Sequence, residues 1–132
     1  MILPDSTALV AAFLSETSAD EVETLLRGGE AGVISANLTE VIDVLVRVFG
    51  NDLESVEAKL VPLLVTTLPV VNIGEAEARR AANIRISHYH RRDAPLSLAD
   101  CLLLGTALVH GAAVTTSDHD VSRHVSGMSR AA

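Results

Sequence analysis

Residues 1–14 read MILPDSTALVAAFL, and they begin an alternation of predicted strands and helices that continues along the chain. Residues 1–4 form a short apolar run that predicts a buried strand, and residues 6–14 predict a helix. Asp5 lies between the two, at the carboxyl end of the strand. A buried strand that leads directly into a helix is typical of α/β proteins, whose parallel sheets carry their functional sites at this end of the strands. The opening segment therefore predicts both a fold class and a place for a site.

The same alternation continues to the end of the chain. Three more apolar runs predict strands at residues 32–36, 68–73 and 112–116. Helices are predicted at residues 18–28, 37–49, 52–66, 75–91 and 97–110, with a last short helix after Asp118. Three of them begin with a capping box: SADE from residue 18, NLTE from residue 37 and SLAD from residue 97. We therefore predict an α/β protein with a three-layer fold, in which helices cover both faces of a central parallel sheet of four or five strands.

The composition predicts one domain, residues 1–132, with an aliphatic core. Hydrophobic residues make up 48% of the chain and aromatic residues only 2%, which excludes a disordered chain and argues against recognition of nucleic acid by base stacking. The single cysteine excludes an intrachain disulfide and a multi-cysteine zinc site. No secretion signal is visible, and the longest apolar runs fall far short of the roughly 20 residues that span a membrane. We therefore expect a cytoplasmic protein.

Four acidic residues are predicted to gather at one end of the sheet: Asp5, Glu40, Asp100 and Asp118. Each also has an ordinary explanation, because the two at the ends of strands suit a helix cap or turn and the other two complete capping boxes. Carboxylates that crowd together repel one another, and their pKa values rise unless cations neutralise them. Oxygen ligands of this kind suit hard cations. The cluster therefore predicts a site for Mg²⁺ or Mn²⁺, where a bound water could be activated for attack on a phosphate.

Four segments carry a family resemblance: MILPDSTALVAAFL, SANLTEVIDVL, LSLADCLLLGTAL and VTTSDHDV. Together, in this order and spacing, they resemble the PIN-domain ribonucleases, and specifically the VapC-type toxins of bacterial toxin–antitoxin pairs. The resemblance extends over essentially the whole chain. It implies a PIN-like fold and cleavage of RNA that depends on Mg²⁺ or Mn²⁺, with tRNA or another structured RNA as substrate. It also implies a homodimer and inhibition by a cognate antitoxin protein.

The resemblance assigns a role to individual residues. It makes Asp5, Glu40, Asp100 and Asp118 the catalytic residues and metal ligands. The hydroxyls of Thr7 and Thr116 match family positions that support the acids, although both also suit ordinary capping. Asp120 is either a further supporting acid or a turn residue. Its role stays open because Val121 follows it, where the family often has an aromatic residue.

A net charge of −7 argues against nucleic acid only if the charge is evenly spread. Half of the ten basic residues, all arginines, fall within residues 79–92, a stretch without any acid. In the predicted helix Arg85, His88 and Arg92 share one face. The inner face is predicted to hold Ala78, Ala82 and Ile86. The stretch is either a solvated basic face or a strip that contacts RNA phosphates through Arg85, Arg91 and Arg92.

The sequence favours an endoribonuclease that cleaves phosphodiester bonds with metal-activated water, but two other functions fit part of the pattern. The first is a catalytically silent PIN-like module that only binds a partner. The second is a phospho-receiver-like domain, which also has an acidic pocket at the end of a parallel sheet. Such a domain needs a lysine near its last strand, whereas the only lysine here, Lys59, falls in the middle of a predicted helix.

Overall fold

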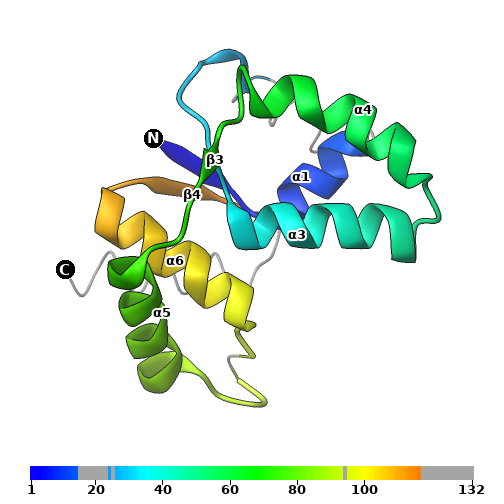
Figure 1. Cartoon of the computed structure of the whole chain (residues 1–132). Helices are drawn as coiled ribbons and strands as arrows, with labels where there is room; N and C mark the ends of the chain where they lie inside the picture. The colour runs from blue at the N-terminus through cyan, green and yellow to red at the C-terminus, as the bar shows by residue number, and fades with distance from the viewer. Residues whose placement is uncertain (15–23, 25, 94, 117–132) are drawn as a thin grey trace.

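The computed structural model describes residues 1–14, 24, 26–93 and 95–116, and its strands run parallel to one another (Figure 1). The strands of this part are β1 (Ile2–Pro4), β2 (Val33–Ile34), β3 (Val70–Val71) and β4 (Ala113–Thr115). Strand β1 pairs with β4, and β2 pairs with β3. A parallel bridge between Ile2 and Ala31 joins the two pairs, so the strands lie in the order β3, β2, β1, β4. The predicted parallel sheet is confirmed, although each strand is shorter than its apolar run.

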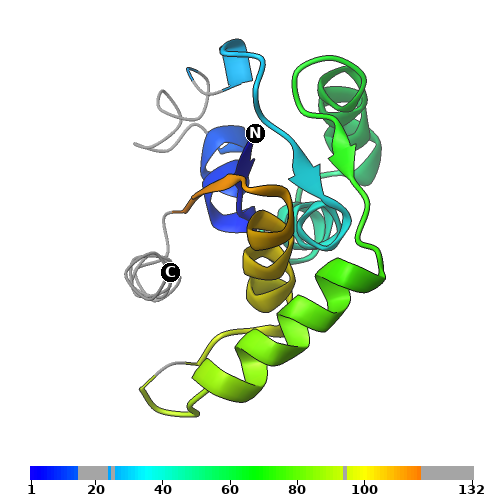
Figure 2. The same ribbon diagram turned by 90° about the vertical axis from the view of Figure 1, so that its left-hand side faces the viewer.

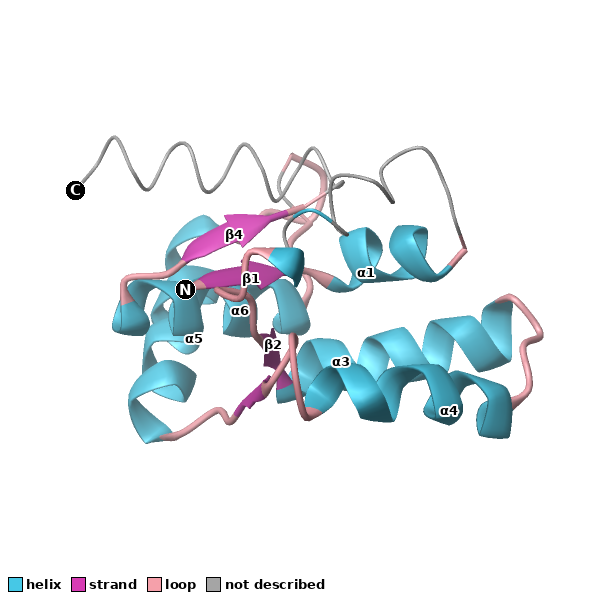
Figure 3. Ribbon diagram, turned by 90° about the horizontal axis from the view of Figure 1, so that it is seen from above, coloured by secondary structure: helices cyan, strands magenta, loops and turns pink. Residues whose placement is uncertain are grey.

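The pairing of β1 with β4 brings the two ends of the chain's described part together. Pro4 lies opposite Thr115, and the backbone N–H of Asp5 donates to the carbonyl oxygen of Thr115 at 2.9 Å. Figure 3 shows the two strands side by side, with α1 continuing from the end of β1. Because the strands are parallel, Asp5 and Thr116 leave the sheet at the same edge.

Five predicted helices are confirmed among the described residues: α1 (Ser6–Phe13), α3 (Ser35–Asp43), α4 (Leu53–Leu64), α5 (Glu75–His88) and α6 (Leu98–His110). A π-helical turn, η1 (Val44–Val48), extends α3. The helix predicted at residues 18–28 lies mostly outside the described residues, as does the whole of the one predicted after Asp118. In the described part of the chain, no helix is both long enough and apolar enough to cross a membrane.

Helices cover both faces of the sheet because side chains alternate along β2. Val33 belongs to a buried cluster with residues of α1, α3 and α4, among them Leu9 and Val41. Its neighbour Ile34 belongs to a second cluster, with Leu3 of β1 and Leu103 of α6. Figure 1 shows the corresponding arrangement, with α1, α3 and α4 on one side of the strands and α5 and α6 on the other. The three predicted layers are therefore present.

Helix α5 packs against α6 at very short range (Figure 2). Gly105 of α6 makes this possible: a Cβ atom at this position would lie 2.7 Å from the backbone nitrogen of Ala81 on α5. At the far end of the contact, Nε2 of His110 lies 2.9 Å from Oε1 of Glu77. The second carboxylate oxygen of Glu77 accepts the backbone N–H of Gly74 at 3.2 Å, which caps the start of α5. These contacts fix α6 relative to the rest of the fold.

The predicted inner face of α5 is wrong. The helix buries Glu77, Ala81 and Ile84, whereas Ala78, Ala82 and Ile86 are exposed, and Ile86 keeps 82% of its surface. The apolar pattern predicted the wrong face because the contact of α5 with α6 depends on the close approach of the backbone at Ala81 and on the polar Glu77–His110 pair. Hydrophobic periodicity records neither of these.

Candidate active site

Asp5 occupies the junction that the sequence predicts, between β1 and α1. Its side chain is only 2% exposed and caps α1 by accepting the backbone N–H of Ala8 at 2.9 Å. The same carboxylate accepts the hydroxyl of Thr7 at 2.8 Å and the hydroxyl of Thr116, which follows β4. Asp5 is thus both a helix cap and the centre of a cluster of hydroxyl donors. Its lone pairs are held in fixed directions at the edge of the sheet.

Glu40 does not complete a capping box, contrary to the interpretation of NLTE. Helix α3 begins at Ser35, with Ile34 as its N-cap and no side-chain cap, so Glu40 is the sixth residue of the helix. The strand pairing ends at Ile34, which leaves Ser35 to begin the helix two residues before the predicted start at Asn37. The carboxylate of Glu40 instead accepts the hydroxyl of Ser6 on α1, at 3.2 Å. Capping therefore no longer explains this acid.

Asp100 does complete the capping box predicted from SLAD. Its backbone N–H donates to Oγ of Ser97 at 3.0 Å, and its Oδ2 accepts the backbone N–H of Ser97 at 3.1 Å. The side chain is partly buried in the first turn of α6. Its position as a cap does not exclude a second role, because helix N-termini also stabilise a carboxylate that faces a site.

The electrostatics of Glu40 join three of the four predicted acids. Burial raises the pKa of Glu40 above its ordinary value of 4.5, and the hydrogen bond from Ser6 opposes this. The charges of Asp100 and Asp5, and to a smaller extent that of Asp43, raise it further. None of the lysines or arginines in the described residues forms an ion pair with Asp5 or Glu40. Asp5 and Glu40 thus lie near each other without a described basic partner, and a bound cation would relieve their repulsion.

The cluster is incomplete among the described residues. Asp118 and Asp120, the two remaining predicted acids, lie outside them. Within the described ranges, no three His, Cys, Asp or Glu side chains lie close enough together to hold a metal ion. The donors that are present nevertheless fit a hard cation, because all are carboxylate oxygens and the buried Asp5 is already oriented by its hydrogen bonds.

Replacing Glu40 with glutamine is expected to raise the free energy of unfolding of the metal-free protein at neutral pH. A raised pKa means that the folded state binds this proton more tightly than the unfolded chain does. The associated stability is present below pH 4.5 and is lost as the pH rises through the folded pKa, so ionised Glu40 destabilises the neutral fold. The gain in stability of Glu40→Gln over the wild type should therefore shrink below pH 4.5. Denaturant unfolding of both proteins at neutral pH and below pH 4.5 measures this difference.

Asp43 provides a control of opposite sign for this experiment. It is on the same helix, but its pKa is lowered, chiefly by the hydrogen bond from Arg47. Asp43→Asn should therefore lower stability slightly at neutral pH and have no effect in acid. A stabilising effect of Asp43→Asn, or none from Glu40→Gln, would contradict the electrostatic description of the site.

The arginines predicted to contact RNA phosphates occupy two different settings. Arg85 donates to the carbonyl oxygen of Leu96 at 3.1 Å and lies 4.6 Å from the centre of the Tyr89 ring. It thereby ties the end of α5 to the segment before α6. Arg91 and Arg92 are exposed in the turn that follows α5. The predicted face that joined Arg85 to Arg92 is wrong, because the helix ends at His88 and the backbone is extended at Tyr89.

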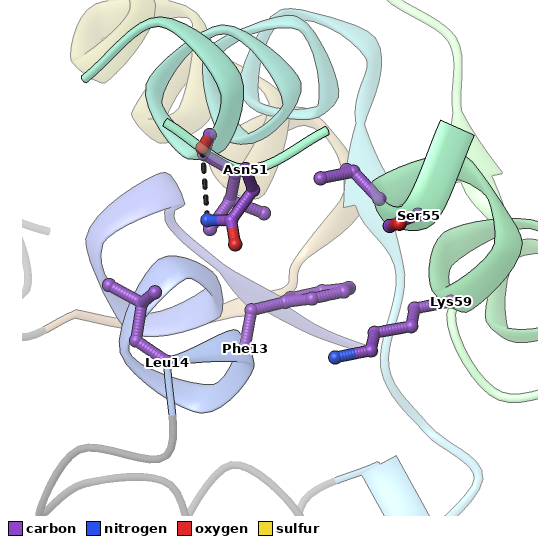
Figure 4. A pocket seen from close by; sticks show the side chains of 7 residues that line it. Phe13, Leu14, Asn51, Ser55 and Lys59 are labelled. Atoms are coloured by element: carbon purple, nitrogen blue, oxygen red, sulfur yellow. Dashed lines mark hydrogen bonds between the residues drawn. The ribbon is translucent and has the colours of Figure 1, made fainter. Parts of the chain in front are cut away.

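The only lysine lies away from the acids. Lys59 lines a hollow of about 310 Å³, including its open mouth, between α4 and the last turn of α1 (Figure 4). In Figure 4 its side chain extends toward Phe13, at the opposite end of α1 from Asp5. The eight residues from Ser6 to Phe13 correspond to about 12 Å along the helix. The lysine that a phospho-receiver needs beside its acids is therefore not supplied by Lys59.

Two polar residues of the site were missed by the sequence reasoning. Ser6 donates to Glu40, and its only signal is that it directly follows Asp5 at the start of a helix. Asn37, one turn before Glu40 on α3, is 2% exposed, and its Nδ2 atom has no hydrogen-bond partner among the described residues. The capping-box interpretation concealed it, because it assigned Asn37 to a cap instead of the interior of the helix.

Comparisons with known proteins give one family and two structural matches. The family model described as the PIN domain matches residues 2–126. VapC20 from Mycobacterium tuberculosis, described as a toxin that cleaves the sarcin–ricin loop, has a similar structure, with a TM-score of 0.74 and 16% identity over 94% of this chain and 95% of that one. A toxin–antitoxin complex from Klebsiella pneumoniae has a TM-score of 0.63 and 19% identity over 89% and 87%. No curated protein matches significantly by sequence.

Proposed function

The chain belongs to the PIN-domain family, and from that premise we propose that it is an endoribonuclease dependent on Mg²⁺ or Mn²⁺. The observation that carries the proposal is the placement of Asp5, Glu40 and Asp100. Asp5 is buried, and the charges of Asp5 and Asp100 both raise the pKa of Glu40. The three carboxylates therefore lie close enough to repel one another, and a shared cation would relieve this repulsion.

The chain's own residues act chiefly by orienting carboxylates. Hydroxyls of Thr7 and Thr116 hold Asp5, the hydroxyl of Ser6 holds Glu40, and the backbone N–H of Ser97 holds Asp100. We propose that these acids, together with Asp118, hold the cation, with Asp120 in a supporting position. When bound, the cation supplies activation of water and stabilises negative charge on the scissile phosphate. Because the cation would supply an activated water, neither Ser6 nor Thr7 is needed as a nucleophile.

We further propose that the protein is the toxin of a toxin–antitoxin pair in the cytoplasm. Both structural matches support this, since one is a toxin that cleaves the sarcin–ricin loop and the other is a toxin–antitoxin complex. The substrate would then be a structured RNA, tRNA or ribosomal RNA, and the partners a cognate antitoxin and a second copy of the chain. The exposed Arg91 and Arg92 are proposed to contact RNA phosphates.

One observation favours a second candidate, a PIN-like module without catalytic activity. No three potential metal ligands lie close together among the described residues. Binding of a cation separates the two functions, because a silent module has no need to bind Mn²⁺.

Titration calorimetry with Mn²⁺ is expected to detect saturable binding to the wild-type protein and binding at least about 10-fold weaker in Asp5→Asn. The matched control is Asp43→Asn, which removes the same charge from an exposed acid paired with Arg47 at 2.9 Å. Its Mn²⁺ affinity should stay close to that of the wild type. Failure of the wild type to bind Mn²⁺, or equal affinity in Asp5→Asn, would favour the silent module.

A further inference from the structure

A hollow lies beside the acids, between the start of α1 and the π-helical turn η1. The described residues that line it are uncharged and mostly apolar: Ser6, Thr7, Val10, Ala11, Val44 and Phe49. Its volume is about 490 Å³, including the solvent at its open mouth. The site described above does not use this hollow.

The hollow and the acids share a wall. Ser6 and Thr7 line the hollow, and their hydroxyls donate to Glu40 at 3.2 Å and to Asp5 at 2.8 Å. The hollow therefore begins one hydrogen bond away from each carboxylate. A phosphodiester bound through a cation at the carboxylates carries a nucleoside on either side, so a flanking base would be within reach of this wall.

Phe49 gives the hollow an aromatic surface. The ring belongs to a residue that is 50% exposed, at the end of η1. Its backbone N–H donates to the carbonyl oxygen of Val44, five residues earlier, at 3.1 Å, so the helix is widened at this turn. Such π-helical turns occur frequently at functional sites. Here the widened turn contributes both Val44 and Phe49 to the hollow.

The other aromatic residues lie elsewhere. The chain has two phenylalanines and one tyrosine, all within the described residues. Phe13 lines the hollow at the far end of α1, and the ring of Tyr89 lies under the guanidinium of Arg85. Phe49 is therefore the aromatic residue available for stacking next to the acids.

We propose that this hollow binds the nucleobase next to the scissile phosphate, stacked on Phe49; this inference rests on the proposed endoribonuclease function. An uncharged lining suits a neutral, flat base better than it suits a phosphate. The hydroxyls of Ser6 and Thr7 offer polar contacts at the rim toward the acids. Base recognition is then limited to one position of the RNA, which agrees with the low aromatic content of the chain.

The test measures whether the effect of removing a single base from the substrate depends on Phe49. RNA strands that contain the mapped cut site are made with an abasic nucleotide at one or the other flank of the scissile phosphate. For the wild type, removal of one flanking base should lower kcat/KM about 10-fold, as expected for the loss of one stacked base. Phe49→Ala should lower kcat/KM for the intact strand by a similar factor and should lose the abasic penalty. Phe49→Tyr should retain the penalty, because a tyrosine ring still stacks.

Val65→Ala is the matched control, because Val65 is an apolar residue on the surface, 77% exposed, and lines neither hollow. It should retain the wild-type abasic penalty. If Phe49→Ala also keeps the full penalty, the proposal is overturned, and the hollow is left for an apolar side chain of a protein partner. Thermal unfolding of Phe49→Ala should be close to wild type, since the side chain is half-exposed.

Binding separates failure of this inference from failure of the proposed function. If the wild type does not cleave RNA with Mg²⁺, the proposed function fails, and fluorescence anisotropy tests the hollow alone. A short RNA strand should bind Phe49→Ala about 10-fold more weakly than the wild type, and a fully abasic strand should bind both equally. Equal binding of the intact strand to both proteins would overturn the base site.

Discussion

Replacing Asp5 with asparagine is expected to lower kcat/KM for Mg²⁺-dependent RNA cleavage by about 10²–10³-fold or more while the fold is retained. Asparagine keeps the size of the side chain and an oxygen that can accept the N–H of Ala8 and the hydroxyl of Thr7. It therefore preserves the cap of α1, since asparagine and aspartate cap helices equally well. What it removes is the negative charge of a carboxylate that is 2% exposed.

Steady-state cleavage of a labelled RNA measures the loss, and thermal unfolding monitors the fold. Asp43→Asn, the exposed acid of α3, should cleave at close to the wild-type rate. If Asp5→Asn cleaves as fast as the wild type, capping alone explains this residue and the proposed active site is wrong. If the melting temperature of Asp5→Asn falls sharply, its loss of activity reflects unfolding. Cleavage by Glu40→Gln, which the raised pKa of Glu40 predicts to be stably folded, then tests the proposed active site.

Replacing Gly105 with alanine is expected to destabilise the protein by about 2–3 kcal/mol. In an exposed helix the same substitution stabilises by about 1 kcal/mol, because glycine is a poor helix former. Here the new Cβ would lie 2.7 Å from the backbone nitrogen of Ala81, 3.0 Å from its Cα and 3.0 Å from the carbonyl oxygen of Glu77. Backbone atoms cannot rotate away, so α5 and α6 must separate.

Equilibrium denaturation measures this effect, with Ser87→Ala on the exposed side of α5 as a control that should change little. A second variant identifies the cause. Adding Ala81→Gly to Gly105→Ala should not restore stability, because the clash involves the backbone of residue 81 and not its side chain. An increase in stability on Gly105→Ala would mean that the two helices are not in close contact. Because α6 carries Asp100, this contact also supports the site.

The parallel sheet and the position of Asp5 could be predicted because each depends on local pattern. Apolar runs separated by helices require a covered parallel sheet, and an acid between strand and helix must lie at its edge. The start of α3 could not be predicted in this way. NLTE has the form of a capping box, but the chain turns into the helix directly after Ile34, and Glu40 falls in the helix interior instead.

Contacts between elements that are distant in sequence account for the other features that the sequence did not predict. The buried side of α5 is set by backbone contact with Gly105 and by the pair of Glu77 with His110, neither of which has an apolar signature. The position of Phe49 could not be predicted, because an aromatic content of 2% says how few rings there are and not where they lie. Its place beside the acids depends on the π-helical turn, which sequence periodicity does not reveal.

Cleavage of a structured RNA by the wild-type protein, followed through chelation and restoration of the metal, tests the central claim most directly. tRNA and ribosomal RNA are incubated with the protein in Mg²⁺, then with excess EDTA, and again after Mg²⁺ is restored. The account predicts defined cuts in Mg²⁺, none in EDTA, and recovery of the same cuts on restoration. Cleavage that survives EDTA, or no cleavage by the folded protein in either Mg²⁺ or Mn²⁺, would contradict it.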